Sequence, residues 1–325
     1  MQLKEIDTKI LRELLIDGRS DFVSIAEKLQ ITEKTVWNRY KFLKKMGVII
    51  GATTHVDYQR SGYGIYVHFT IKMDPNRVNE AIIKIEKLPG LYMVAKGIQN
   101  YNVMVGLSMK NMNEIDNVKN RLHSITLADE ILSEIWLEVK NIPENLQILL
   151  DEKQFYQPLK ERTELKDKKD CNEVKVDNID LEIIDLLSIN GRMSFSAIAK
   201  EIGKSIDTIS KRYKKLVKCN ILKVVIQINP IKLGYKCMMM FNLSFSAKVS
   251  LVEKRNEIIM IPNVIHLVKT RGRFDFSVYA FVQDIEQLLD LQEKISRLND
   301  LLKIEITSLK IFNVWPLPKQ YISTF

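Results

Sequence analysis

The chain has 325 residues, which is long enough for two or more domains with separate hydrophobic cores. Hydrophobic residues make up 46% of it and charged residues 27%, as in ordinary globular proteins. The net charge of +9 favours a polyanionic partner. The first ten residues have no apolar signal core, and no apolar run is as long as a membrane span. These features exclude a membrane-embedded class, and we expect a cytoplasmic protein with no membrane partner.

The sequence repeats itself when it is shifted by 173 positions. Residues 6–46 then match residues 179–219 at 16 of 41 positions without a gap, and Gly18-Arg19 falls on Gly191-Arg192. Two helices of similar rhythm would not place such pairs at equal offsets, so we infer a tandem duplication of one module. Residues 1–150 carry 20 basic and 18 acidic side chains, and residues 176–325 carry 22 and 15.

Each copy opens with three predicted helices. In the first copy the predicted elements are a helix over residues 6–15, a short second helix, a third helix over 33–45 and a small hairpin, the wing, over 48–58. Thr32 is a good N-cap for the third helix, and Ser205 fills that position in the second copy. Two short helices with a tight turn between them, the later one basic, predict a winged helix-turn-helix over residues 1–60 and again over 177–233.

The rest of each copy has the residue spacing of strands that alternate with helices. In the first copy we predict strands over residues 63–73, 91–96, 103–108 and 130–139, and helices over 76–88 and 111–125. In the second copy we predict strands over 236–245, 264–270, 275–281 and 302–312, and helices over 251–260 and 285–298. This β-α-β-β-α-β order predicts a ferredoxin-like fold over 61–150 and 234–325, in an α+β chain. Residues 151–176 are highly charged, which predicts a linker.

The sequence resembles the Lrp/AsnC (feast/famine) transcription regulators over both copies. The resemblance rests on the aspartate that opens the first helix, the Gly18-Arg19 pair after it, and the T-V-x-x-R-Y-x-x-L pattern of residues 35–43. It implies that the ferredoxin-like domains sense small molecules, that dimers form through their sheets, and that effectors bind between them. Family members usually carry one module per chain, and this chain carries two.

The resemblance also implies an effector site at a hairpin of the type G-x-[YF]-D. The second copy matches it with Gly272-Arg273-Phe274-Asp275, and the first copy has Gln99-Asn100-Tyr101-Asn102. Gly272 would let the backbone approach closely, and Asp275 would supply a charge for an ammonium group, whereas Asn102 offers only hydrogen bonds. An ordinary β-hairpin is the alternative in each copy. The candidate effector-binding residues are Gly272, Arg273, Asp275, Asn100 and Asn102.

Double-stranded DNA is the expected partner of the two basic helices. The residues expected to neutralise phosphates are Arg39, Lys41, Lys44 and Lys45 in the first copy and Arg212, Lys214 and Lys215 in the second. Base reading is expected from Lys34 and Asn38, and from Ser210 and Lys211.

Trp37 is a further candidate for DNA contact, and it shares with Arg39 and Arg212 a structural alternative. Arg39 and Arg212 lie next to the buried stripe of their helices, so a pairing with an acid of the first helix, such as Asp7 or Asp180, is an equal interpretation. Trp37 is placed to pack either on the DNA backbone or on its own domain.

Pairing of the two ferredoxin-like domains within one chain would give a pseudo-dimer that reads an asymmetric site, and pairing between chains is the competing arrangement.

The enzyme alternative is a fused pair resembling siroheme decarboxylases, which would need histidines and arginines gathered on the sensor domain. A sensing or scaffold protein with one silent module is a further alternative. The sequence shows no metal cluster, no phosphate-binding glycine loop and no nucleophile-base pair, so we expect no catalysis and no cofactor.

Overall fold

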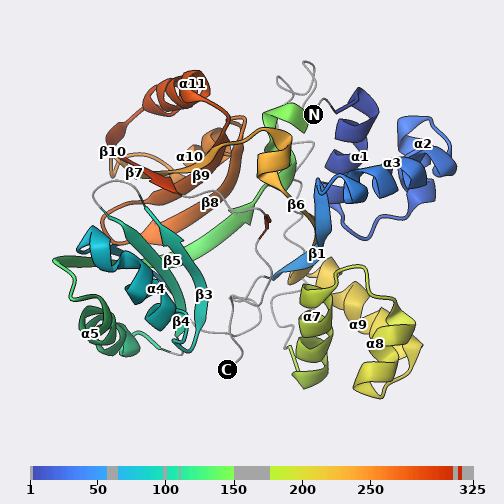
Figure 1. Cartoon of the computed structure of the whole chain (residues 1–325), viewed down its shortest axis with the longest axis horizontal. Coiled ribbons are helices and arrows are strands. Elements are labelled where there is room, and N and C mark those ends of the chain that lie inside the picture. Colours follow the sequence, from blue (N-terminus) through green and yellow to red (C-terminus); the bar gives the residue numbers. More distant parts are fainter. Residues whose placement is uncertain are drawn as a thin grey trace. The chain divides into compact units, whose positions relative to one another are not determined.

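The computed structural model describes residues 3–56, 65–97, 101–109, 111–149, 176–309 and 314–316 (Figure 1). They divide into two compact units, and neither unit is one copy of the repeat. One unit holds both helix-turn-helix modules, and the other holds both ferredoxin-like domains. The predicted linker lies outside the described residues except for Val176.

The helical unit contains two three-helix modules, each followed by a strand. The first module has α1 (Glu5–Ile16), α2 (Phe22–Leu29), α3 (Glu33–Lys45) and β1 (Ile49–Val56). The second has α7 (Asn178–Ile189), α8 (Phe195–Ile202), α9 (Ile206–Lys218) and β6 (Leu222–Ile228). The predicted caps are confirmed, because the hydroxyls of Thr32 and Ser205 accept the backbone N–H groups of Thr35 and Thr208 at 3.2 and 3.1 Å.

The predicted wing hairpin over residues 48–58 is wrong. The described part of this segment forms a single strand, β1, which pairs antiparallel with β6 of the other copy, with Ala52 opposite Ile226. The segment holds no Asn-Gly or Asp-Gly turn of the kind that closes a tight hairpin, whereas the duplicated strand offers a matching edge. The hydroxyl of Thr53 in β1 also donates to the carbonyl of Ser188 in α7 at 2.8 Å. Each module is therefore completed by the other.

The second unit repeats the predicted β-α-β-β-α-β order. The first copy supplies β2 (Ile65–Lys72), α4 (Val78–Ile85), β3 (Leu91–Lys96), β4 (Val103–Met109), α5 (Glu114–Thr126) and β5 (Glu130–Asn141). The second copy supplies β7 (Cys237–Phe245), α10 (Leu251–Ile258), β8 (Val264–Arg271), β9 (Phe276–Val282), α11 (Ile285–Ser296) and β10 (Leu301–Leu309).

The eight strands form one antiparallel sheet in the order β10-β7-β9-β8-β5-β2-β4-β3. The two copies meet where β5 pairs with β8, with Asn141 opposite His266. The outer edges also approach one another, because Gly97 after β3 forms an isolated bridge with Leu309 of β10. The two ferredoxin-like domains thus pair within the chain, and this pairing covers strand edges that would otherwise be open.

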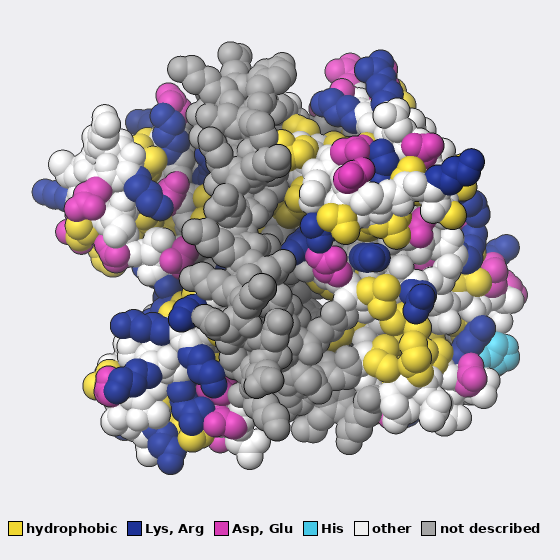
Figure 2. Space-filling model, turned by 180° about the vertical axis from the view of Figure 1, so that it is seen from behind, with side chains coloured by type: hydrophobic (Ala, Val, Ile, Leu, Met, Phe, Trp, Pro, Cys, Tyr) yellow, Lys and Arg dark blue, Asp and Glu magenta, His cyan; other side chains and the backbone are white. Residues whose placement is uncertain are grey.

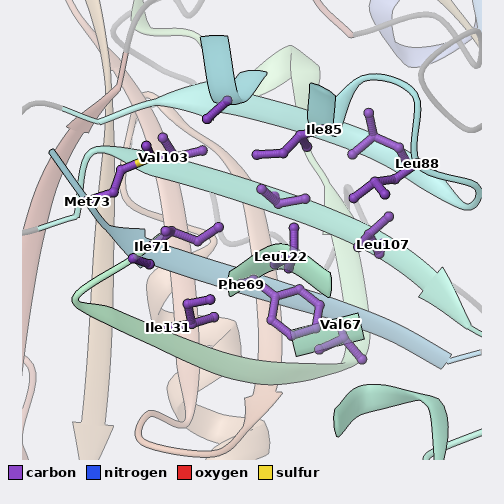
Figure 3. Close-up of a cluster of buried hydrophobic side chains, with 14 of the residues drawn as sticks. Val67, Phe69, Ile71, Met73, Ile85, Leu88, Val103, Leu107, Leu122 and Ile131 are labelled. Atoms are coloured by element: carbon purple, nitrogen blue, oxygen red, sulfur yellow. The ribbon is translucent and has the colours of Figure 1, made fainter. Parts of the chain in front are cut away.

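Alternate residues of the sheet build a core under the helices. Val67, Phe69 and Ile71 of β2 are fully buried there and pack with Ile85 of α4 and Leu122 of α5 (Figure 3). Because side chains alternate along a strand, His68 faces the opposite side of the sheet, where it is also buried. Both faces of β2 are therefore covered.

Candidate nucleic-acid interface

Helix α3 presents a basic outer face on an aromatic base. Trp37 is 44% exposed, and its ring lies 5.6 Å from that of Phe22 and 6.4 Å from that of Tyr40 between centroids. The Lys41 ammonium lies 4.4 Å from the centre of the Trp37 ring, a cation–π contact. Trp37 thus packs on its own module and still has a free surface. The predicted DNA-binding residues of α3 that are exposed are Lys34, Trp37, Asn38, Lys41, Lys44 and Lys45.

Arg39 fastens α3 to α1. Its Nε and Nη2 donate to the two carboxylate oxygens of Asp7 at 2.6 and 2.5 Å, and Asp7 is fully buried. These hydrogen bonds raise the pKa of Arg39 above its usual value. The structural alternative for Arg39 is therefore confirmed as a contact, and contact of Arg39 with DNA stays a prediction.

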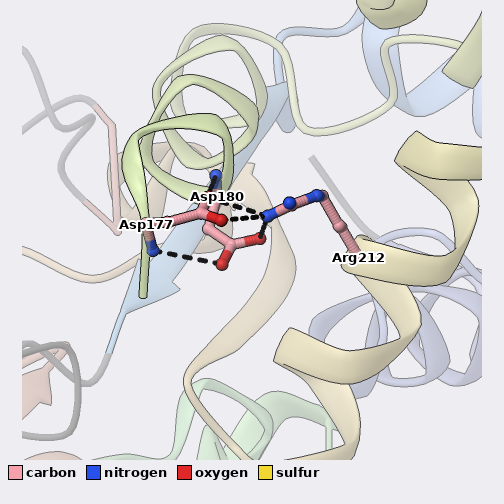
Figure 4. Close-up of polar contacts among 3 residues, drawn as sticks. All are labelled: Asp177, Asp180 and Arg212. Carbon is pink, nitrogen blue, oxygen red and sulfur yellow. Dashed lines mark hydrogen bonds and ion pairs between the residues drawn. The ribbon is translucent and has the colours of Figure 1, made fainter. Parts of the chain in front are cut away.

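Arg212 does the same in the second module (Figure 4). Its Nη1 donates to Asp177 at 2.7 Å and to the buried Asp180 at 3.0 Å. The hydrogen bond from Arg212 lowers the pKa of the Asp177 carboxyl. In both modules an arginine of the recognition helix thus satisfies the buried aspartate that opens the first helix.

The outer face of α9 is basic but arranged differently. Lys214 and Lys215 are exposed, and Lys and Arg side chains gather over the α7–α9 lobe, at the lower left of Figure 2. Ser210 is half-buried. Lys211 is exposed, but its Nζ lies 2.8 Å from Oδ2 of Asp207, one turn earlier. Lys211, which was predicted to contact bases, therefore already pairs with an acidic residue. Asn38, at the same position of α3, is uncharged and forms no such ion pair.

The Gly-Arg pairs connect the two modules, which sequence reasoning missed. Arg19 Nη1 donates to the carbonyls of Gly191 and Met193 in the other module at 2.9 and 2.8 Å. Arg192 Nη1 returns the contact to the carbonyl of Gly18 at 2.7 Å. The recurrence of Gly-Arg was the available signal, but a single sequence does not say that the contact crosses between copies.

Aromatic rings and close backbone packing complete this exchange. The Arg19 guanidinium lies 4.6 Å from the centre of the Phe195 ring, and that of Arg192 lies 5.0 Å from the Phe22 ring. A Cβ added to Gly18 would lie 2.7 Å from the carbonyl carbon of Val225, so only glycine fits there. The two modules that contain α3 and α9 are therefore held together by reciprocal contacts.

The predicted effector hairpins use their acidic or amide residue structurally. The Asp275 carboxylate accepts the backbone N–H of Phe245 at 2.8 Å. In the first copy Oδ1 of Asn102 accepts the backbone N–H of Met73 at 3.1 Å. The same strand connection is thus made in both copies, as in an ordinary β-hairpin.

The two hairpins nevertheless come together through other residues. Arg273 Nη1 donates to the Tyr101 hydroxyl of the other copy at 3.1 Å, and its Nη2 donates to Glu305 at 2.5 Å. Gly272 is exposed beside Arg273, and Asn100 lies outside the described residues. Effector binding by Gly272, Arg273, Asp275, Asn100 and Asn102 stays a prediction.

A polar cluster that the sequence did not predict lies where β5 meets β8. The Trp136 ring lies 5.4 Å from His68, 5.8 Å from His266 and 6.4 Å from Tyr279 between centroids. Nε2 of His68 and the Tyr279 hydroxyl are buried and have no hydrogen-bond partner among the described residues. Burial lowers the pKa of His68 to about 3 and that of His266 to about 4, and raises that of the neighbouring Glu134 to about 7.

Two further searches cover the described ranges. No helix in them is long and apolar enough to cross a membrane. No group of three or more His, Cys, Asp or Glu side chains within the same ranges is placed to hold a metal ion.

Two capped helix-turn-helix modules with basic recognition helices, accompanied by two ferredoxin-like domains, define a DNA-binding transcription regulator of the winged helix-turn-helix class. Comparison with family models agrees. An AsnC-type helix-turn-helix domain matches residues 176–217, and a winged helix-turn-helix DNA-binding domain matches residues 3–50.

Known relatives resemble one module of this chain. The HTH-type transcriptional regulator Ptr1 of Methanocaldococcus jannaschii is 34% identical over 115 residues, which are 35% of this chain and 76% of that protein. The HTH-type transcriptional regulator FL11 of Pyrococcus furiosus is 30% identical over 123 residues, 38% of this chain and 82% of that protein. The chain belongs to the Lrp/AsnC family of transcription regulators.

A solved structure matches both modules at once. The crystal structure of the siroheme decarboxylase NirDL covers 94% of this chain and 90% of its own, with a TM-score of 0.60 and 16% sequence identity. At this identity the likeness is one of fold.

Proposed function

We propose that this chain regulates transcription by binding double-stranded DNA sequence-specifically, with α3 and α9 of one chain in place of the two recognition helices of a dimer. The observation that carries the proposal is the pairing of β1 with β6, which joins the two modules within the chain. Helix-turn-helix dimers bind half-sites about 34 Å or a multiple of it apart, with the first residues of each recognition helix against base edges. One chain therefore holds both of the readers that such a site needs.

Affinity comes mainly from lysines that neutralise phosphates. Lys41, Lys44 and Lys45 of α3 and Lys214 and Lys215 of α9 are exposed and form no ion pair with a described acidic residue. Five phosphate contacts release counterions to the solvent, so log K should fall with log salt at a slope of about −4.5. Arg39 and Arg212 contribute by holding the recognition helices in place.

The bases are read by the first turns of the two helices, which have diverged. Lys34 and Asn38 of α3 are exposed and suit guanine and adenine respectively. The first turn of α9 carries the Asp207–Lys211 ion pair instead. We therefore expect an asymmetric site whose two halves differ in sequence.

Binding of labelled duplexes by the full chain tests this function. Fluorescence anisotropy across a salt series should give the steep slope stated above, and sedimentation velocity should show one chain per duplex. The variant K44Q/K45Q should reduce the slope by about two. K84Q, which removes a lysine of the ferredoxin-like unit that pairs with Glu80, is the control and should bind as the unchanged chain does. Absence of duplex binding, or two chains on each duplex, would contradict the proposal.

The ferredoxin-like unit would make binding responsive to a small effector, of which an amino acid is the first candidate. Support comes from the Arg273–Tyr101 contact between the two hairpins and from the buried polar atoms beside Trp136. Thermal melting of the full chain with each amino acid at millimolar concentration tests this. A rise in melting temperature with one of them, accompanied by a change in DNA affinity, is expected, and no change with any would contradict it.

A siroheme-transforming enzyme is the second candidate. The observation that favours it is that His68 and His266 lie beside the same tryptophan, Trp136, in a fold shared with NirDL over most of the chain. The basic recognition helices and the relatives named as transcriptional regulators favour DNA binding. An absorbance titration with siroheme decides between them, because a decarboxylase would shift the siroheme bands and consume its carboxylates.

A further inference from the structure

The first residue of α9 is an exposed isoleucine. Ile206 follows the Ser205 cap directly and is 55% exposed. The matching position of α3 holds Glu33, so this apolar side chain is specific to the second module. Residues at the start of a recognition helix are the ones that reach base edges in the major groove.

The polar neighbours of Ile206 are already paired with one another. Asp207 Oδ2 lies 2.8 Å from Lys211 Nζ, and both side chains are more than 70% exposed. The hydrogen bond to Asp207 raises the pKa of Lys211. The lysine in turn neutralises the negative charge of Asp207, which would otherwise repel the phosphates of DNA. Ser210 is half-buried. The exposed start of α9 thus offers an apolar side chain beside an acid and a lysine that are paired with each other, whereas α3 begins with Glu33 and Lys34.

We propose that Ile206 reads thymine through its 5-methyl group, and that Asp207 holds Lys211 away from the base edges. Among the four bases only thymine presents a methyl group in the major groove, and apolar side chains are the groups that recognise it. This inference rests on the proposed DNA-binding function and assigns the specificity of its second half-site. Lys214 and Lys215, further along α9, supply the phosphate contacts that position the helix.

Uracil substitution measures this contact directly, because deoxyuridine differs from thymidine only by the missing methyl group. The full chain is first used to select bound duplexes from random DNA. Each thymine of the selected site is then replaced in turn by deoxyuridine, and affinity is measured by anisotropy. Loss of one methyl contact should weaken binding about fourfold at one position of one half-site.

Variants of two exposed isoleucines in the same module assign the effect. I206A should bind the thymine and uracil duplexes equally. I189A, which shortens a 66% exposed isoleucine at the end of α7, should keep the full difference. A selected site in which no thymine responds, or a uracil effect that persists in I206A, would overturn the inference while leaving DNA binding intact. Failure to select any sequence would overturn this inference together with the proposed function.

Discussion

Helices α3 and α9 both have 13 residues, begin at a hydroxyl cap, and are fastened to the first helix of their module by an arginine–aspartate pair. Their outer faces differ. In α3 the ammonium of Lys41 stacks on an exposed tryptophan, Trp37, whereas in α9 the serine Ser210 occupies the tryptophan position and is half-buried.

The difference shows which contacts the duplicated fold depends on. Contacts such as Arg39–Asp7 and Arg212–Asp180 are common to both modules, because removing the arginine would leave a buried aspartate without compensation. Exposed positions carry no such cost, so they can diverge without loss of the fold. The two modules therefore share a structure and need not share a DNA sequence.

The largest expected effect comes from breaking the Arg39–Asp7 pair. R39A leaves the buried Asp7 carboxylate without its cation, which should cost about 3–5 kcal/mol of the free energy of unfolding. R212A should cost less, because Arg212 meets its two acids through a single nitrogen, Nη1, and Asp177 is exposed. Urea denaturation measures both.

The double variant R39A/D7N is the control for this prediction. It removes the uncompensated charge together with the arginine, so it should recover much of the loss. Equal effects of R39A and R212A would contradict the difference drawn between the two modules.

The positions of α3 and α9 and their arginine–aspartate pairs could largely be predicted from the sequence. Thr32 and Ser205 stand before basic, periodic segments, and local capping chemistry was enough to place α3 and α9. The pairing of Arg39 and Arg212 with acids of the first helix was one of two open interpretations, because helical spacing places each arginine beside a buried stripe.

What could not be predicted depends on contacts between the copies. The sequence predicts a local hairpin after α3, because a single sequence does not reveal that the partner strand, β6, lies more than 160 residues later. The hydrogen bonds of Arg19, and the packing of His68 and His266 beside the same tryptophan, Trp136, also join the two copies. A single sequence does not reveal such contacts either. The hydrogen bond that Asp275 accepts from the backbone of Phe245 joins residues 30 positions apart, so the family pattern alone does not predict it.

The next largest effect should come from separating the two modules. R19A removes two hydrogen bonds from a guanidinium to carbonyls of the other module, and should cost about 2–3 kcal/mol. R192A should cost nearly the same, because the contact is reciprocal. R297A, which removes an exposed arginine directly after α11, should have little effect. Clearly unequal losses for R19A and R192A in urea denaturation would show that the exchange is not reciprocal.

The free energy of unfolding should depend on pH, and the buried histidines and the buried Glu134 of the ferredoxin-like unit should change it in opposite directions. The pKa values of His68 and His266 in the folded chain, about 3 and 4, lie below the ordinary 6.5. The unfolded chain therefore binds more protons as pH falls below about 6.5, and stability is lost on acidification. The pKa of Glu134 is raised from 4.5 to about 7, so its folded form binds more protons between those values and offsets part of the loss.

We expect a net loss of about 2 kcal/mol between pH 7 and pH 5, and about twice that in E134Q, which lacks the offset. Urea denaturation at a series of pH values measures the two profiles. E130Q, which changes an exposed glutamate of the same strand, should follow the unchanged chain. Parallel profiles for E134Q and the unchanged chain would be inconsistent with a raised pKa for Glu134.

The smallest expected effect concerns the ion pair at the start of α9. D207A frees Lys211 to meet DNA and should raise affinity about threefold while weakening discrimination between sequences. E33A removes a first-turn acid from α3 and serves as the matched control, since it removes a negative charge without releasing a described lysine partner. Anisotropy with selected and scrambled duplexes measures both. An equal gain in the two variants would show that charge alone, and not the release of Lys211, is responsible.

Selection of bound sequences from random DNA by the full chain tests most directly whether two unlike modules act together. The structure predicts a site with two halves of different sequence, bound by a single chain in one orientation. Enrichment of a palindromic site, in which α3 and α9 occupy identical halves interchangeably, would contradict it.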